Sequence, residues 1–196
     1  MNRTPVHAAV VLAGLLVASP ALAWKLVAEG APFTHKTGYS IQYPAGWRWV
    51  KMPFGDETLA TRDGPDLQLI AVDFRKHKGA FRALKQDSSP AMMPQELAQK
   101  LVAEATSARG LQNMEILSDE PTTLAGRPGF RLHLAYRTSV DAGSVRYEEY
   151  VVGASSPQGI FIISYRAPHL HFFGRDKEIF EQSLATFAIS DKVAKN

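Results

Sequence analysis

The sequence predicts an α+β domain in which helices cover both faces of a mainly antiparallel β-sheet, an α/β/α sandwich. In residues 130–137, large apolar side chains alternate with Arg131, His133, Ala135 and Arg137, as in a strand with one buried face. Residues 67–74 and 160–165 are apolar almost throughout, which indicates strands covered on both faces. Residues 94–108 and 176–187 each carry an apolar stripe with helical spacing, so a helix is available for each face.

The first part of the predicted sheet comes from short strands separated by turns. Residues 39–43 alternate between aromatic or aliphatic and polar side chains, and the turn Pro44-Ala45-Gly46 follows them. Trp47 and Trp49 then share one face of the next short strand. Residues 58–62 predict a third strand, which leads into the apolar strand described above.

Residues 75–91 form the least regular region of the chain. They are rich in Lys and Arg, contain Gly79 and end in Ser88-Ser89-Pro90. We predict an exposed loop with a short helix around residues 81–85. Its role stays open between a mobile flap over a binding site and a solvated connection.

The second half of the chain predicts two helices around a group of strands. Pro94 stands in the first turn of the helix at 94–108. A strand near residues 113–117 and a turn-rich stretch at residues 119–129 come next. The alternating strand then turns back through Asp141-Ala142-Gly143 to form a β-hairpin, and the helix at 176–187 closes the domain.

Residues 1–23 have the pattern of a cleaved signal peptide. A weakly basic start with Arg3 precedes the uncharged run at residues 8–18, and Ala21-Leu22-Ala23 fits the small-x-small cleavage site. The alternative is an uncleaved N-terminal anchor. A membrane span needs about 20 apolar residues, which the run reaches only if Ser19 and Pro20 are included. The pattern therefore predicts a periplasmic or secreted protein.

Cleavage would leave a mature chain that begins at Trp24, with one domain at residues 24–190 and a flexible tail at residues 191–196. The chain has no cysteine, which excludes both a bacterial lipid anchor and disulfide bonds. Loss of Arg3 lowers the formal charge from +3 to +2. So small a surplus does not predict a nucleic-acid-binding surface.

Several segments resemble the PsbP-like and DcrB-like families. They are the strand and turn at residues 38–47 (GYSIQYPAGW), Gly126-Arg127-Pro128-Gly129-Phe130 before the hairpin, residues 160–168 (IFIISYRAP) and the closing residues 180–187. The resemblance covers about residues 33–190. It implies an α/β/α sandwich with a non-catalytic role as an accessory or binding module. The resemblance supplies no catalytic motif, so no functional residue is transferred from it.

The residues themselves indicate no catalytic site either. Gly153-Ala154-Ser155-Ser156-Pro157 begins like a nucleophile elbow, but Pro157 replaces the second glycine and favours a turn. There is no HExxH, P-loop or GxGxxG motif. Adjacent acids such as Glu148 and Glu149 point to opposite faces of a strand, which is a poor arrangement for a shared acid–base pair. We expect a protein that is not an enzyme.

His169 and His171 are the candidate metal ligands. Residues two apart in an extended chain project to the same side, so both imidazoles can reach one zinc ion. Zinc needs one or two further ligands, for which Asp176 and His35 are the residues to consider. The alternative is a pair of surface histidines in the loop after Pro168.

Two further groups of side chains have open roles. The polar side of the hairpin is either a patch for an anionic partner or a solvated face; its residues are Arg131, His133, Arg137, Arg146 and Glu148. The aromatic set is either a partner surface or part of the core; its residues are Tyr39, Tyr43, Trp47, Trp49, Phe172 and Phe173.

Together these observations predict an exported, non-enzymatic accessory protein of the bacterial cell envelope that binds a protein or peptide. The alternative is a periplasmic domain that binds a small molecule or a metal ion. A hydrolase with an unrecognised site is a third class, because fold alone does not exclude chemistry.

Overall fold

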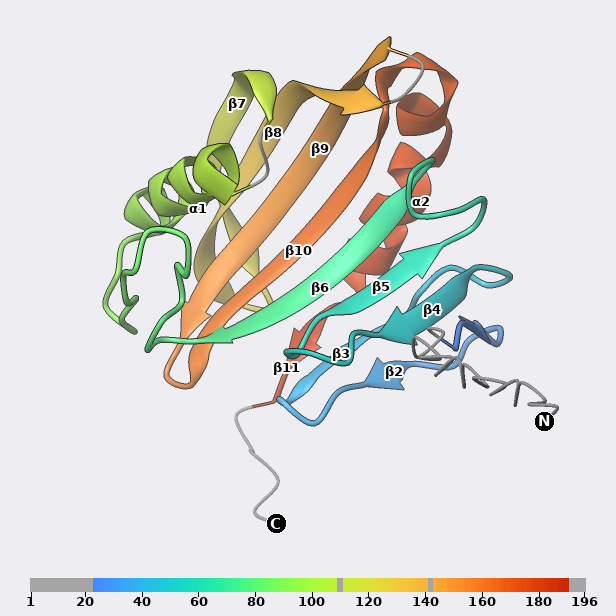
Figure 1. Cartoon of the computed structure of the whole chain (residues 1–196). Helices are drawn as coiled ribbons and strands as arrows, with labels where there is room; N and C mark the ends of the chain where they lie inside the picture. The colour runs from blue at the N-terminus through green and yellow to red at the C-terminus, as the bar shows by residue number, and fades with distance from the viewer. Residues whose placement is uncertain (1–22, 109–110, 141–142, 191–196) are drawn as a thin grey trace, which may run out of the picture.

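The computed structural model describes residues 23–108, 111–140 and 143–190, which form one large sheet, one small sheet and two α-helices (Figure 1). Residues 1–22 of the predicted signal peptide and the predicted tail at residues 191–196 lie outside the described residues. In the described ranges, neither helix has the length and apolar character needed to cross a membrane.

The large sheet of the described chain has eight strands in the order β1-β4-β5-β6-β10-β9-β8-β7, and every neighbouring pair is antiparallel. The strands are β1 (Lys25–Leu26), β4 (Arg48–Lys51), β5 (Thr58–Thr61), β6 (Leu69–Lys76), β7 (Gln112–Leu124), β8 (Arg127–Val140), β9 (Gly143–Ser156) and β10 (Gly159–Pro168). The predicted α+β sandwich with a mainly antiparallel sheet is therefore confirmed.

A small sheet joins the two ends of the described chain. Its strands are β2 (Phe33–Thr34), β3 (Tyr39–Ile41) and β11 (Ala188–Ile189), with β3 in the middle. The predicted strand at residues 39–43 thus forms, but it lies in this second sheet beside the end of the chain (Figure 1).

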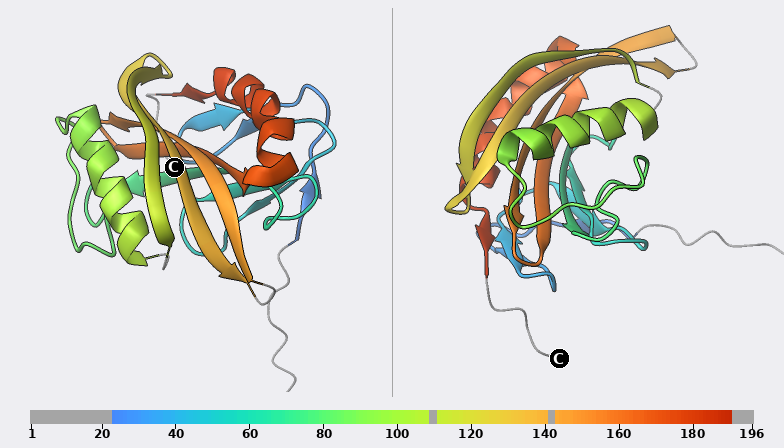
Figure 2. Two further views of the ribbon diagram at one scale, coloured as in Figure 1. Left: turned by 90° about the horizontal axis from the view of Figure 1, so that it is seen from above. Right: turned by 90° about the vertical axis from the view of Figure 1, so that its left-hand side faces the viewer.

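The two helices lie on opposite faces of the large sheet, as the doubly covered strands predicted (Figure 2). Helix α1 (Pro94–Ala108) packs against β7, β8 and β9, and helix α2 (Gly174–Ala185) follows a short irregular π-type turn, η1 (His169–Phe173), on the other face. We call these the α1 face and the α2 face. The α1 face buries Leu97, Leu101, Phe130, Leu132, Leu134, Val151, Ile160 and Ile162. The α2 face buries a larger and more aromatic core, which includes Tyr39, Trp47, Phe161, Tyr165, Phe180 and Phe187.

Gly153 occupies a position in the core of the α1 face that has no room for a larger side chain. The ring of Phe130 on β8 lies over Gly153 on β9, the residue opposite it in the register. A Cβ atom on Gly153 would come within 2.6 Å of that ring, far inside van der Waals contact. Gly153 therefore makes room for a core aromatic side chain.

The turn-rich stretch predicted at residues 119–129 is wrong. Strand β7 runs on to Leu124, and a tight turn at Ala125 and Gly126, with φ of 50° and 75°, leads directly into β8. Positive φ at both central residues is typical of the two-residue hairpin turn. The strand tolerates Pro121 because β7 is an outer strand, where a missing N–H need not break the ladder.

The short helix predicted around residues 81–85 is also wrong. The segment is a turn closed by a bridge between Phe81 and Gln86, and Lys85 adopts a positive φ of 54°. Phe81 and Ala80 are fully buried in the core of the α1 face, so the loop is anchored there although its charged side chains are exposed.

Candidate binding groove

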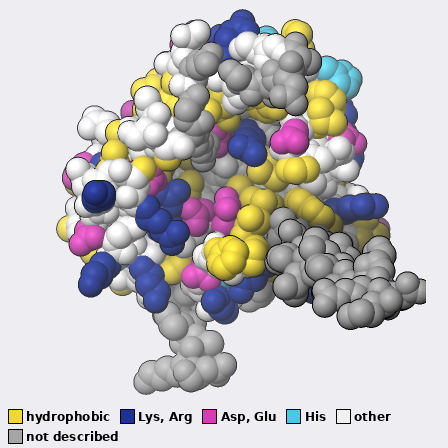
Figure 3. Space-filling view, in the orientation of Figure 1, with side chains coloured by type: hydrophobic (Ala, Val, Ile, Leu, Met, Phe, Trp, Pro, Cys, Tyr) yellow, Lys and Arg dark blue, Asp and Glu magenta, His cyan; other side chains and the backbone are white. Residues whose placement is uncertain are grey.

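A groove of about 690 Å³ lies on the α1 face, between helix α1 and strand β6 (Figure 3). It exists because α1 packs over β7, β8 and β9 and does not extend across β10 and β6. The loop after β6 closes one end through Gly79, Ala80 and Arg82, and the turn between β4 and β5 contributes Phe54 and Gly55.

Apolar side chains of the sheet and of helix α1 line part of the groove. Alternate residues of three neighbouring strands point toward α1 because successive side chains of a strand face opposite sides. These residues are Leu132 and Leu134 on β8, Val151 on β9 and Ile162 on β10, and they meet Leu101, Val102 and Ala105 of the helix. The apolar stripe predicted on the helix therefore forms one wall of the groove.

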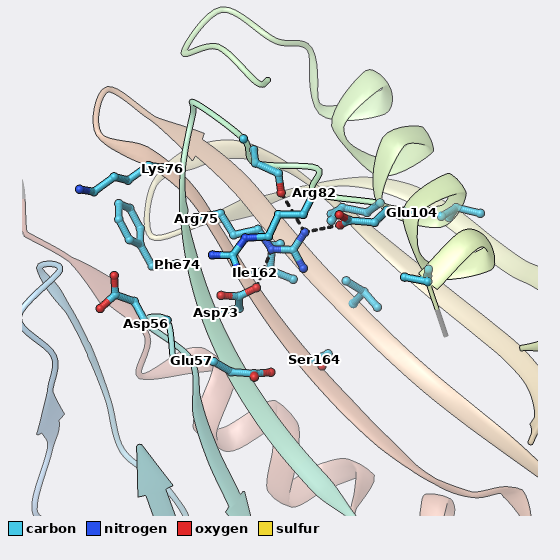
Figure 4. Close-up of a pocket in the computed structure, with 18 of the residues that line it drawn as sticks. Asp56, Glu57, Asp73, Phe74, Arg75, Lys76, Arg82, Glu104, Ile162 and Ser164 are labelled. Atoms are coloured by element: carbon cyan, nitrogen blue, oxygen red, sulfur yellow. Dashed lines mark hydrogen bonds and ion pairs between the residues drawn. The ribbon is translucent and has the colours of Figure 1, made fainter. Parts of the chain in front are cut away.

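An ion-pair network links the helix to the uncovered part of the sheet (Figure 4). Arg75 on β6 donates from Nη1 to the carboxylate of Glu104 on α1 and to the Ala80 carbonyl oxygen at 3.1 Å, and from Nε to Asp73 at 2.6 Å. Burial disfavours the charged guanidinium, but the two carboxylates outweigh it and raise the pKa of Arg75. The network joins three segments that surround the groove.

Glu149 is a buried carboxylate that lines the same groove. It is almost fully inaccessible and accepts a hydrogen bond from the Tyr136 hydroxyl at 3.0 Å. Its neighbour Glu148 lies on the α2 face and bonds to His133 and His169. The expectation that these adjacent acids point to opposite faces is confirmed.

His169, one of the two candidate metal ligands, shares a hydrogen bond with the Glu148 carboxylate through its Nδ1. The other oxygen of Glu148 bonds to His133 Nε2 at 2.7 Å. His171 is exposed, has a positive φ of 70° and contacts the ring of Phe172 edge to face. The structure thus pairs His169 with Glu148 and gives no shared partner for His169 and His171.

The additional ligands considered for zinc lie in other surroundings. Asp176 is buried and bonds to Arg62 and Arg175, while His35 packs in the small sheet against Tyr39. Across the described ranges, no group of three or more His, Asp or Glu side chains is arranged to hold a metal ion. Zinc binding by His169 and His171 stays a prediction, for which calorimetry with wild type and with the His169→Ala/His171→Ala variant is the test.

The polar side of the hairpin is more enclosed than a solvated face. Arg131 pairs with Glu181 of α2 and lies 4.4 Å from the Tyr150 ring, and Glu148 is buried. The solvated interpretation fits the exposed Arg137 and is wrong for Glu148, because α2 and η1 cover this part of the sheet. Sequence alternation alone does not show this second covering layer.

The aromatic set belongs to the core. Tyr39, Tyr43, Trp47 and Phe173 are buried, and Trp49 and Phe172 are half-buried against them; all six lie on the α2 face. The core interpretation is therefore confirmed.

Both outer strands of the large sheet are poor templates for strand addition. Strand β1 has only two residues. Strand β7 has two register irregularities, and it also contains Pro121 and the exposed acids Asp119 and Glu120. Short length, bulges, proline and charge are the features that protect sheet edges. The groove is therefore a better candidate for recognition than either edge.

The features of the sequence that could have indicated the groove are limited. The predicted helical stripe supplies one wall of the groove, but the loop predicted at residues 75–91 starts too early, because Arg75 and Lys76 end β6 itself. Asp73 and Glu104 carry no motif that marks them as partners of Arg75. Their meeting depends on a helix that begins some twenty residues after the strand.

Comparison with known proteins identifies the fold but not a close relative. No protein-family model matches the chain, and no curated protein matches its sequence. Among solved structures, it is similar to cyanobacterial PsbP (CyanoP) from Synechocystis sp. PCC 6803, with 14% identity and a TM-score of 0.54 over 82% of this chain and 92% of that one.

Two further similar structures are the Ran-binding protein Mog1p of Saccharomyces cerevisiae and LpqN of Mycobacterium tuberculosis, which is involved in cell envelope biogenesis. Mog1p shows 13% identity and a TM-score of 0.52, over 86% of this chain and 96% of that one. LpqN shows 13% identity and a TM-score of 0.50, over 87% of this chain and 92% of that one. A larger structure from Bacteroides thetaiotaomicron is matched over only 52% of its own length. The chain therefore has the Mog1/PsbP-like fold.

Proposed function

We propose that this chain is an exported, non-enzymatic accessory protein of the bacterial cell envelope that holds a segment of a protein partner in the groove beside α1. Export is supported by the signal-peptide pattern of residues 1–23. Structures of the same fold include a protein involved in cell envelope biogenesis and a Ran-binding protein, which support an envelope location and a binding role respectively.

The observation that carries the proposal is the composition of the groove. Leucine, valine and isoleucine side chains line the groove together with carboxylates and cations, among them Glu57, Asp73 and Arg82. A peptide segment offers both kinds of group, apolar side chains for the apolar lining and polar groups for the charged lining. Recognition sites commonly combine apolar surface with a few placed polar groups in this way.

Site-specific photo-crosslinking in cells tests the proposal. A benzophenone amino acid replaces Ala105 or Ala108, which line the groove, and in a matched control it replaces the exposed Ala103 of the same helix, which does not. We expect crosslinks to one envelope protein from positions 105 and 108 and none from position 103. Equal crosslinking from all three positions, or none from the groove positions, would overturn the proposal.

A small-molecule ligand is the second candidate. The groove volume of about 690 Å³ lies within the range of about 300–1,000 Å³ that is usual for ligand pockets. Native mass spectrometry of the protein purified from the envelope distinguishes the two functions. A bound small molecule that is lost in the groove-filling variant Ala105→Trp would favour this candidate over a peptide partner.

A further inference from the structure

Four cations lie at the end of β6 and in the loop after it, and three of them line the groove. Lys76 ends β6, and Lys78, Arg82 and Lys85 follow in the loop; all four are exposed. Within the ranges that the structure describes, none of them forms an ion pair. Figure 3 shows dark blue side chains on this part of the surface. We call these four residues the basic patch.

Nearby carboxylates offset the charge of the basic patch only in part. Asp56 lies 3.1 Å from Lys36, and Asp73 and Glu104 both bind Arg75. Inside the loop, the exposed Asp87 accepts a hydrogen bond from the neutral Gly79 N–H at 2.7 Å and keeps its negative charge. Residues 76–87 contain the four cations and this one acid, so the segment keeps a formal charge of +3.

Phe54 lines the same groove as Lys76, Lys78 and Arg82, and its side chain is almost entirely in water. It occupies the turn between β4 and β5 and is 90% exposed. The turn that presents it is closed by the Met52 N–H donating to the Glu57 carbonyl oxygen at 2.9 Å. A hydrogen-bonded turn thus presents an aromatic ring to solvent on the groove that the cations also line.

An anionic lipid surface fits this combination better than a soluble anion or an acidic protein. Lys and Arg near a membrane are attracted by acidic headgroups, and an aromatic side chain gains by entering the interface between headgroups and acyl chains. A soluble anion would leave Phe54 in water. A stable protein interface would need a broader apolar centre than one ring.

We propose that the basic patch and Phe54 form a docking surface for an anionic phospholipid membrane. Phe54 and three of the four cations also line the proposed partner groove, so the test below separates membrane docking from partner binding. Docking would be reversible, since a few cations and one inserted ring anchor a protein only weakly. It would place this part of the groove toward the membrane.

Vesicle co-sedimentation tests this with the protein expressed from its full sequence and purified after any processing. We expect binding to vesicles of phosphatidylcholine mixed with phosphatidylglycerol, little binding to pure phosphatidylcholine, and a decrease with added salt. Each Lys or Arg near an acidic surface contributes roughly a fivefold factor in affinity, so Lys78→Gln/Arg82→Gln should lower it about 25-fold. Excess inorganic phosphate should not compete, which separates a lipid surface from a phosphate site.

The matched control is Arg137→Gln/Lys177→Gln, which removes the same charge from exposed positions on β8 and α2. It should bind as wild type does. A Phe54→Trp variant reports insertion directly, because indole fluorescence shifts to the blue on entering the interface, measured against the wild-type background. Thermal unfolding of all variants should match wild type, since the altered side chains are exposed.

Three outcomes would overturn the proposal. One is the absence of phosphatidylglycerol-dependent binding. The second is an equal loss in the control variant, which would show that net charge alone is responsible. The third is loss of the groove crosslink in Lys78→Gln/Arg82→Gln without any vesicle binding, which would assign the patch to the protein partner instead.

Discussion

The Arg75 guanidinium on β6 and the Glu104 carboxylate on α1 form an ion pair that connects the helix to the part of the sheet it does not cover. The same guanidinium also holds Asp73 and the Ala80 carbonyl oxygen. One side chain thus links β6, the loop after it and α1. In the described chain the helix makes no other ion pair with β6.

Removal of Arg75 should destabilise the fold. Arg75→Met leaves the carboxylates of Asp73 and Glu104 without their common partner, and each is mostly shielded from water. Loss of one member of a fully buried ion pair costs about 3–5 kcal/mol, and the partial exposure of Arg75 lowers our expectation to about 2 kcal/mol. Urea unfolding measures the change in the free energy of unfolding.

The double variant Arg75→Met/Glu104→Met measures the energetic coupling between the two residues. If the two residues interact as described, it should be less destabilised than the sum of the single variants, with a coupling of about 1 kcal/mol or more. Additive effects would show that the ion pair does not link the helix to β6.

Asp176 should be among the most sensitive polar positions. Its carboxylate is fully buried at the start of α2 and accepts hydrogen bonds from Arg62 at 3.0 Å and from Arg175. Asp176→Ala removes this shared partner and should lower the free energy of unfolding by about 3 kcal/mol. The exposed Glu178 of the same helix is the control, and Glu178→Ala should change the free energy of unfolding by no more than about 0.5 kcal/mol. Similar effects at both positions would contradict this account.

His35 should make the domain less stable in mild acid. It is buried against Tyr39, its Nε2 has no hydrogen-bond partner in the described chain, and burial together with Lys51 lowers its pKa below the ordinary 6.5. The unfolded chain therefore binds the proton first. The contribution of neutral His35 to the free energy of unfolding is fully present above pH 6.5. It is lost as the pH falls through the lower pKa that His35 has in the folded state.

Chemical unfolding at several pH values checks this expectation. His35→Phe keeps an aromatic ring at the position but cannot titrate, so its stability should fall less between pH 7 and pH 5 than that of wild type. His171→Ala, at an exposed position, should retain the wild-type dependence. Parallel pH curves for His35→Phe and wild type would rule out His35 as the cause.

Export predicts a defined N-terminus. If the signal peptide is cleaved after Ala23, intact-mass measurement and N-terminal sequencing of protein from the periplasmic fraction should both give Trp24 as the first residue. Replacement of Ala21 and Ala23 by larger residues should leave the precursor uncleaved. Wild-type protein that retains residues 1–23 would support the anchor alternative.

Local sequence patterns were sufficient for most of the fold. The helix predicted at residues 94–108 has the observed bounds, and the alternating and continuous apolar runs became β8, β6 and β10. These patterns are informative because the side-chain period of a helix or strand depends only on its own residues. The predictions for residues 81–85 and 119–129 failed because tertiary structure outweighed the local signals. Burial of Phe81 against the sheet outweighed the helix signal at residues 81–85. The position of β7 at the sheet edge outweighed the turn signals at residues 119–129.

The sequence by itself determined the fold class and which face of each main element belongs to the core. It also contains a leader pattern typical of export. Only the tertiary structure decided where the groove lies, that Arg75 meets Glu104, and that Phe54 lines the same groove as cations of the basic patch. The reason is that these features join segments far apart in the chain. Their contacts depend on strand order and helix placement, which no local period of residues records.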